Sequence, residues 1–285
     1  MNAVDRPHAH DVPGSDAVHG AFALSAKGLV KRFGGITATQ NVTLNLTHGA
    51  RHALIGPNGA GKTTLINLLT GVLAPSEGYI KLDGADITQL APHERVRRGL
   101  VRTFQISQLF ESMTPLQTLA LVVEHQMHGS RQWWRPLGSG KVVAQRAAEL
   151  LEQFHLGDVR DQPVRVLAYG KRRLLEIAMA LAGQPRVLLL DEPVAGVPAG
   201  ERDELLGIVA ALPADVSVLL IEHDMDLVFS FATRMTVLVN GAVLTEGTPE
   251  EIAADARVKA VYLGQSRDAD AGHGTPSPAP GVGAA

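Results

Sequence analysis

The sequence predicts an α/β fold with a mainly parallel β-sheet, and three observations lead to this class. The apolar run 187–190 is typical of a parallel strand buried on both faces, and 216–221 reads as another strand. The short apolar strand 51–55 runs into a glycine-rich loop and then a helical pattern. Turn dipeptides at 83–84 and 240–241 indicate hairpins. The expected fold also includes an antiparallel region near the N-terminus.

Length and composition restrict the class of protein. The 285 residues, 45% of them hydrophobic, can bury a full core within one domain. A net charge of -3 gives no electrostatic case for binding nucleic acid, and the lack of cysteine excludes disulfides and thiolate metal sites. No segment approaches the roughly 18 apolar residues of a membrane span, and no signal peptide is visible. We therefore expect a cytosolic protein whose membrane role comes through a partner.

Both ends of the chain are predicted to be disordered tails. Residues 1–21 and 266–285 mix Pro, Gly, Asp and His without periodicity. His8, His10 and His19 could bind a metal, but biased tracts of this kind favour a solvated tail. The folded domain is expected to span 22–265.

The stretch GPNGAGKTT, residues 56–64, fits the phosphate-binding pattern G-x-x-x-x-G-K-[ST]. Its glycines let backbone N–H groups turn toward phosphate oxygens, Lys62 reaches the β and γ oxygens, and the Thr63 hydroxyl can ligate magnesium. Apolar residues from Leu65 to Val72 follow at helical spacing, so the dipole of this helix faces the phosphates. The nucleotide-binding residues expected here are Gly56, Asn58, Gly59, Ala60, Gly61, Lys62, Thr63 and Thr64.

Two predicted strands end in residues suited to hydrolysis. Asp191 and Glu192 follow the run 187–190, and ligands of open α/β sheets lie beyond the carboxyl ends of the strands. Asp191 is the expected magnesium partner, directly or in the outer shell of the ion, and Glu192 the base for the attacking water. The alternative is that both residues are solvated acids at the end of a strand. The phosphate loop earlier in the chain favours the catalytic interpretation over this one. His223 could position the water, although a lone histidine is more often structural.

The stretch LAYGKRRLL, residues 167–175, raises a question of charge. An apolar-periodic run places a helix start near Lys171, and three successive cations then crowd the positive end of the helix dipole. A bound anion would relieve this crowding. A basic surface without a ligand is the alternative.

Five motifs in this order give the chain a family resemblance. GPNGAGKTT, Gln105 in RTFQ, LAYGKRR, LLLDEP and His223 in IEHD resemble those of the ATPase subunit of an ATP-binding cassette (ABC) transporter. The resemblance covers nearly all of 22–264 and implies a P-loop core with a helical subdomain inserted at about 106–165. LAYG, KRFGGITA, GTPEEI and VYLG are most similar to the branched-chain amino acid importer type.

The resemblance also implies roles for individual residues. Two such subunits face each other head to tail, so Gly170 would bind the ATP held by the partner's P-loop, with the backbone N–H groups that follow it. Gln105 would ligate magnesium and face the membrane subunit. Phe33 matches the aromatic residue that stacks on adenine, with a core phenylalanine as the alternative. Three departures from the family pattern, at Ala168, Tyr169 and Pro198, affect the second half of this shared site.

The expected function is magnesium-dependent ATP hydrolysis that drives solute import. The expected partners are membrane permease subunits, a second ATPase subunit in a homodimer or heterodimer, and indirectly a solute-binding protein, but no nucleic acid. The chain would lie peripherally on the cytoplasmic face of the inner membrane. Alternatives are cassettes for urea or amides, aromatic acids or lipopolysaccharide export, a non-transport cassette acting on DNA or ribosomes, and a regulatory protein without turnover, which Glu192 argues against.

Overall fold

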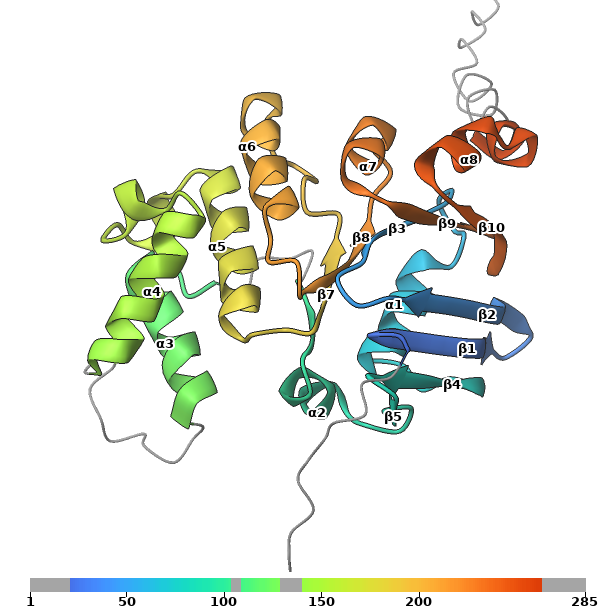
Figure 1. Cartoon of the computed structure of the whole chain (residues 1–285), viewed down its shortest axis with the longest axis horizontal. Helices are drawn as coiled ribbons and strands as arrows, with labels where there is room; N and C mark the ends of the chain where they lie inside the picture. Colours follow the sequence, from blue (N-terminus) through green and yellow to red (C-terminus); the bar gives the residue numbers. More distant parts are fainter. Residues whose placement is uncertain (1–20, 104–108, 129–139, 263–285) are drawn as a thin grey trace, which may run out of the picture.

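The structure is a computed structural model that describes residues 21–103, 109–128 and 140–262. The two predicted tails, except for Ala21, lie outside these ranges, and so does Gln105. Two sheets and a group of helices make up the described part of the chain (Figure 1).

The larger sheet has the order β10-β9-β3-β8-β7-β6, and every neighbouring pair is parallel except β10 with β9. All residues of β7 and β8 are buried, as expected for strands covered on both faces. The predicted mainly parallel sheet is therefore confirmed. Its strands are β3 (Arg51–Ile55), β6 (Leu100–Arg102), β7 (Val187–Asp191), β8 (Ser217–Ile221), β9 (Arg234–Val239) and β10 (Ala242–Gly247).

The smaller sheet is the predicted antiparallel region, with the order β2-β1-β4-β5. Asp83 and Gly84 have φ angles of 51° and 80°, and Asn240 and Gly241 have 48° and 79°. Positive φ at both central positions is the requirement of a type I′ hairpin turn, so both predicted hairpins are confirmed. The strands are β1 (Leu24–Phe33), β2 (Ile36–Leu46), β4 (Glu77–Leu82) and β5 (Ala85–Asp86).

Helix α1 (Lys62–Thr70) lies between the two sheets, where its leucines join one apolar cluster with side chains of β1, β2, β3 and β7 (Figure 1). The prediction that Val72 continues its apolar face is wrong. Gly71 adopts a left-handed conformation, φ 79°, and its N–H bonds to the Leu68 carbonyl, which ends the helix. Val72 is consequently 57% exposed.

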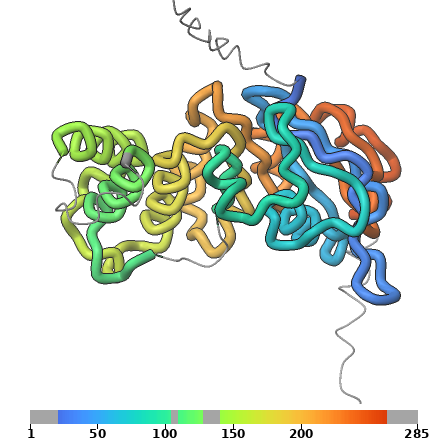
Figure 2. Tube along the Cα trace, turned by 90° about the horizontal axis from the view of Figure 1, so that it is seen from below, coloured from blue at the N-terminus to red at the C-terminus, as the bar shows by residue number. Residues whose placement is uncertain are grey.

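Helices α3 (Pro115–His128) and α4 (Lys141–Gln153) fall in the range predicted to be a helical subdomain and lie at the end of the molecule opposite the antiparallel strands (Figures 1 and 2). They pack on each other and on α5 (Tyr169–Ala182). The remaining helices are α2 (Pro92–Arg97), α6 (Ala199–Ala210), α7 (Met225–Phe231) and α8 (Pro249–Ala254). None of the helices in the described ranges combines the length and the apolar character that crossing a bilayer needs.

Candidate nucleotide site

The glycine-rich loop between β3 and α1 has a backbone that only glycine accommodates. Gly61 precedes α1 with φ 98°, and a Cβ there would lie 2.6 Å from the Ala38 carbonyl oxygen. Gly56 approaches the Leu238 carbonyl so closely that any side chain would collide with it. Gly61, the residue at the start of α1, has no side chain that could cap the helix. The first N–H groups of α1 are therefore available to an anion, as in other phosphate-binding helix starts.

A cavity of about 570 Å³ opens over this loop and joins segments far apart in the sequence. Residues 58–64 form one wall, and residues 36–38 with Gln40 of β2 and the hairpin tip 240–241 form the other. Glu192, which follows β7, also lines the cavity. The fold thus places the predicted phosphate loop and the predicted base around one space.

Lys62 is folded onto its own loop. Its Nζ donates to the Gly56 carbonyl at 2.6 Å and to the Pro57 carbonyl at 3.1 Å. Burial lowers the pKa of the Lys62 ammonium, whereas the carboxylates of Glu192 and Asp191 act in the opposite direction. A cation in this position can bind a phosphate oxygen by exchanging the two carbonyls for it.

Asp191 is 4% exposed at the end of β7 and forms an ion pair that sequence reasoning missed. Arg102, the last residue of β6, donates from Nη2 to Asp191 Oδ2 at 2.6 Å and from Nη1 to Asn67 Oδ1 at 2.8 Å. The sequence signal for this ion pair is Arg102 itself, a cation three residues before Gln105. Carboxylate and hydroxyl oxygens are the ligands that magnesium prefers, so Asp191 and Thr63 fit this ion.

Glu192 and His223 lie next to each other. Glu192 has a left-handed backbone, φ 47°, and its Oε1 is 3.9 Å from His223 Nδ1. The side chain of His223 is 66% exposed, so this ring is accessible from the solvent side. Glu222, buried completely beneath the ring, is a further carboxylate of this cluster to which the sequence assigned no role.

Phe33 lies at the tip of the β1–β2 hairpin. It is 47% exposed, with the Lys31 ammonium 5.2 Å from the centre of its ring, so the interpretation as a core phenylalanine is wrong. Its partner across the hairpin, Ile36, lines the cavity, although Phe33 itself does not. Stacking on adenine stays a prediction.

Helix α5 begins at Tyr169, two residues before the predicted start at Lys171. Gly170 therefore lies in the first turn, and its N–H donates to Glu201 Oε2 on α6 at 3.0 Å.

The three cations of this segment find acceptors within the chain. Lys171 donates to the His155 carbonyl at 2.6 Å, Arg172 to the Arg165 carbonyl at 2.6 Å, and Arg173 to Glu176 at 2.7 Å. The crowding of charge therefore does not require a bound anion, and that part of the sequence argument is wrong.

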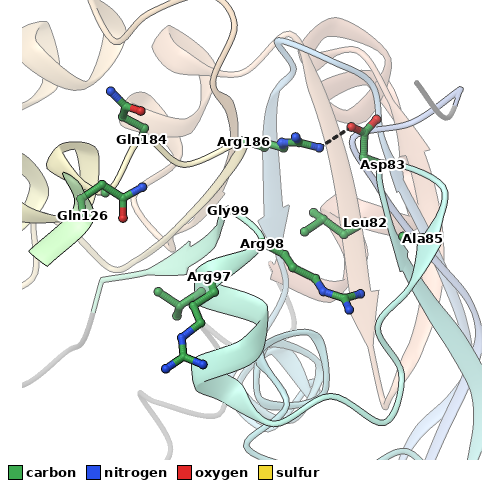
Figure 3. Close-up of a pocket in the computed structure, with 11 residues that line it drawn as sticks. Leu82, Asp83, Ala85, Arg97, Arg98, Gly99, Gln126, Gln184 and Arg186 are labelled. Carbon is green, nitrogen blue, oxygen red and sulfur yellow. Dashed lines mark hydrogen bonds and ion pairs between the residues drawn. The ribbon is translucent and has the colours of Figure 1, made fainter. Parts of the chain in front are cut away.

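A separate cavity of about 360 Å³ lies between α2, the β4–β5 turn and the C-terminal ends of α3 and α5 (Figure 3). Arg186, which pairs with Asp83 at 2.6 Å, and Gly99 border it. Both residues precede the amino ends of strands, whereas the nucleotide cavity is at the carboxyl ends. None of the predicted site residues that the structure describes lines this second cavity.

Comparison with known proteins identifies the family. A family model described as "ABC transporter" matches residues 39–195. The chain belongs to the ABC transporter family. A second model, described as "Branched-chain amino acid ATP-binding cassette transporter", matches residues 242–268 of this cassette. The resemblance predicted from the five motifs is confirmed.

Curated relatives and solved structures agree with this assignment. The cassette is 41% identical over 252 residues to the branched-chain amino acid transport ATP-binding protein BraF of Pseudomonas aeruginosa, and 41% identical over 256 residues to LivG of Escherichia coli. Each match covers 85% of this chain and 98% of the relative. An ATP-binding cassette solved in its ADP conformation superposes with a TM-score of 0.75 at 31% identity, covering 85% of this chain and 99% of that one. The predicted fold class is thereby confirmed.

Proposed function

We propose that this ABC cassette binds and hydrolyses magnesium-ATP to energise uptake of branched-chain amino acids or related small solutes. Membership of the family implies ATP hydrolysis coupled to transport. The observation that carries the proposal for this chain is the single cavity lined by both the phosphate loop and Glu192. The names of the relatives BraF and LivG, and the second family model, support the cargo class.

The residues around the cavity divide the chemistry among them. Lys62 and the N–H groups that open α1 hold the phosphates, and Thr63, Asp191 and Gln105 hold the metal. When bound, magnesium supplies charge neutralisation at the phosphate oxygens. Glu192 accepts the proton of the attacking water, and His223 orients that water. Phe33 provides a stacking surface for adenine at the hairpin tip.

Two cassettes complete the site by pairing head to tail. A solved relative, a dimeric ATP-binding cassette bound to ADP and Pi, has a TM-score of 0.66 at 25% identity and supports such a pair. In the proposed pair, which can be a homodimer or a heterodimer, Gly170 and the start of α5 face the partner's ATP. Permease subunits bind the dimer on the cytoplasmic face of the membrane, and a solute-binding protein delivers cargo to them.

Replacing Glu192 by glutamine tests the hydrolytic site. Without the carboxylate the attacking water keeps its proton, so we expect ATP hydrolysis to fall by about 10²–10⁴-fold while ATP binding persists. Steady-state phosphate release and equilibrium dialysis with ATP measure the two effects. Lys62→Ala is the contrasting variant, since it should lose ATP binding itself. A wild-type rate in Glu192→Gln would remove Glu192 from the role of base and leave His223 as the candidate.

A further inference from the structure

Glu222 is a buried carboxylate at the carboxyl edge of the larger sheet. It follows β8 directly and is 0% exposed. Within the described ranges, the one basic side chain with a nitrogen within 4 Å of it is His223, whose Nδ1 lies 3.8 Å from Glu222 Oε2. Burying a charged group is costly unless hydrogen bonds or opposite charges compensate, so the partners of this carboxylate indicate what it does.

Two backbone N–H groups hold the carboxylate. Val194 donates to Oε1 at 3.3 Å, and His223 donates to Oε2 at 3.2 Å. One donor belongs to the turn after β7 and the other to the turn after β8. The side chain therefore links the two chain segments that leave the carboxyl edge of the sheet.

This link continues the pairing of the two strands beyond the sheet. The last ladder pair is Asp191 with Ile221, and the Glu192 N–H still bonds to the Ile221 carbonyl at 2.9 Å. The chain then turns at the left-handed Glu192, so a regular ladder cannot continue. The Glu222 carboxylate takes the place of the next backbone acceptor and holds Val194. The direction of the Glu192 side chain depends on both of these contacts.

The ring of His223 lies between two carboxylates. Its Nδ1 is 3.9 Å from Glu192 Oε1 on the cavity side and 3.8 Å from Glu222 Oε2 on the buried side. Glu222 thus contacts the backbone N–H of Val194 through Oε1 and the ring of His223 through Oε2.

We propose that Glu222 is a positioning residue for hydrolysis that fixes Glu192 and His223 relative to each other. The proposal rests on the roles given above to Glu192 and His223. It places Glu222 outside the phosphate-binding contacts, because the cavity is lined by Glu192 but not by Glu222. The expected effect of losing the carboxylate is therefore on turnover and not on nucleotide binding.

Glu222→Gln in the full chain tests this expectation. The amide keeps one acceptor oxygen but turns an NH₂ group toward the second N–H donor, so one of the two links is lost. Misplacing reacting groups by about 1 Å can lower turnover by about 100-fold, and we expect kcat to fall about tenfold or more with KM within about twofold of wild type. Glu222→Asp, which keeps the carboxyl group, should recover part of the lost kcat. Glu251→Gln is the matched control, because the Glu251 carboxylate also accepts a backbone N–H, that of Thr248 in the cap of α8. This variant should leave kcat unchanged.

Three outcomes decide between the explanations. Wild-type kcat in Glu222→Gln, while Glu192→Gln and His223→Ala lose activity, overturns the positioning role and leaves the proposed function intact. Wild-type rates in Glu192→Gln and His223→Ala would instead remove the proposed catalytic roles. A purely structural role would lower the melting temperature and the ATP affinity together with kcat in both Glu222→Gln and Glu222→Asp, and this result also overturns the proposal.

Discussion

Arg102 shows how one residue connects three parts of the site. Its guanidinium joins the end of β6 to Asp191 on β7 and to Asn67 on α1. The two side chains of the ion pair are only 13% and 6% exposed, and a buried charge left without its partner is strongly destabilising. The pair therefore fixes the Asp191 carboxylate before any metal binds, and it ties β6, the strand that leads to Gln105, to the same place.

His52 gives the folded chain a predictable response to acid. The ring is 1% exposed on β3 and hydrogen-bonded to Thr236 Oγ1 at 2.8 Å, and burial lowers the pKa of His52 from 6.5 to about 4. The unfolded chain therefore binds a proton at a higher pH than the folded chain does. The contribution that the neutral His52 ring makes to the free energy of unfolding is fully present above pH 6.5 and is lost as the pH falls toward 4.

The variant His52→Gln removes this titration but keeps a polar group beside Thr236. The free energy of unfolding, measured by urea denaturation from pH 8 to pH 4, should fall more steeply in the wild type, by about 3 kcal/mol over the range. Only the difference between the two proteins matters, since other groups titrate in both. Parallel pH curves would show that His52 does not carry the proton-linked loss.

The starts of helices α5 and α6 contact each other where the proposed dimer would close. The Gly170 N–H is occupied by Glu201 of the same chain, and a Cβ at Gly196 would be 3.4 Å from the Tyr169 ring. The carboxylate of Glu201 thus lies where the proposed head-to-tail pair brings a γ-phosphate. Either the carboxylate moves or it repels the phosphate, and both effects oppose closure.

Glu201→Gln should therefore ease ATP-driven pairing. The amide keeps an acceptor for Gly170 but carries no charge, so the ATP concentration that half-saturates dimerisation should fall several-fold. The measurement uses light scattering with the Glu192→Gln background, in which hydrolysis does not reopen the dimer. Asp203→Asn, on an exposed position of the same helix, is the matched control and should change nothing. An unchanged or higher ATP requirement in Glu201→Gln contradicts the expectation.

In one chain, the phosphate loop and the start of α5, which form the two halves of the proposed shared site, lie apart. The cavity over the phosphate loop is not lined by Gly170, whose helix packs on α3 and α4. Within one chain, damage to the start of α5 should leave ATP binding to the phosphate loop intact. We expect Gly170→Asp to bind ATP normally as an isolated chain but to lose ATP-driven dimerisation, because its carboxylate would face the γ-phosphate.

Mixing Gly170→Asp with Lys62→Ala is the sharper experiment on a self-paired dimer. One orientation of the mixed pair joins an intact phosphate loop to an intact α5 start, so one working site and part of the hydrolysis rate should return. The added side chain also meets Glu201, so the melting temperature of Gly170→Asp is the control for folding. Loss of ATP binding in isolated, folded Gly170→Asp would contradict the head-to-tail arrangement, and no recovery on mixing would contradict self-pairing.

The sequence by itself determined the parts of this protein that depend on neighbouring residues. The spacing in GPNGAGKTT, the apolar runs of β7 and β8 and the two turn dipeptides each predict a local backbone, because φ preferences and periodicity act over a few positions. The family followed from the order of such local motifs. Gly71 is the local signal for the end of α1.

Only the tertiary structure decided which side chains meet. Arg102 pairs with Asp191 across 89 positions, Gly170 with Glu201 across 31, and Val194 with Glu222 across 28. Each contact depends on strand order or helix packing, and neither is encoded in the spacing of one segment. Lys171 and Arg172 are a further case, because their sequence suggested a missing anion and the fold supplied the carbonyl acceptors of His155 and Arg165. Arg173, in contrast, pairs with Glu176 within the same helix. Charge balance is a property of the three-dimensional neighbourhood, since electrostatic energy depends on distance in space and not along the chain.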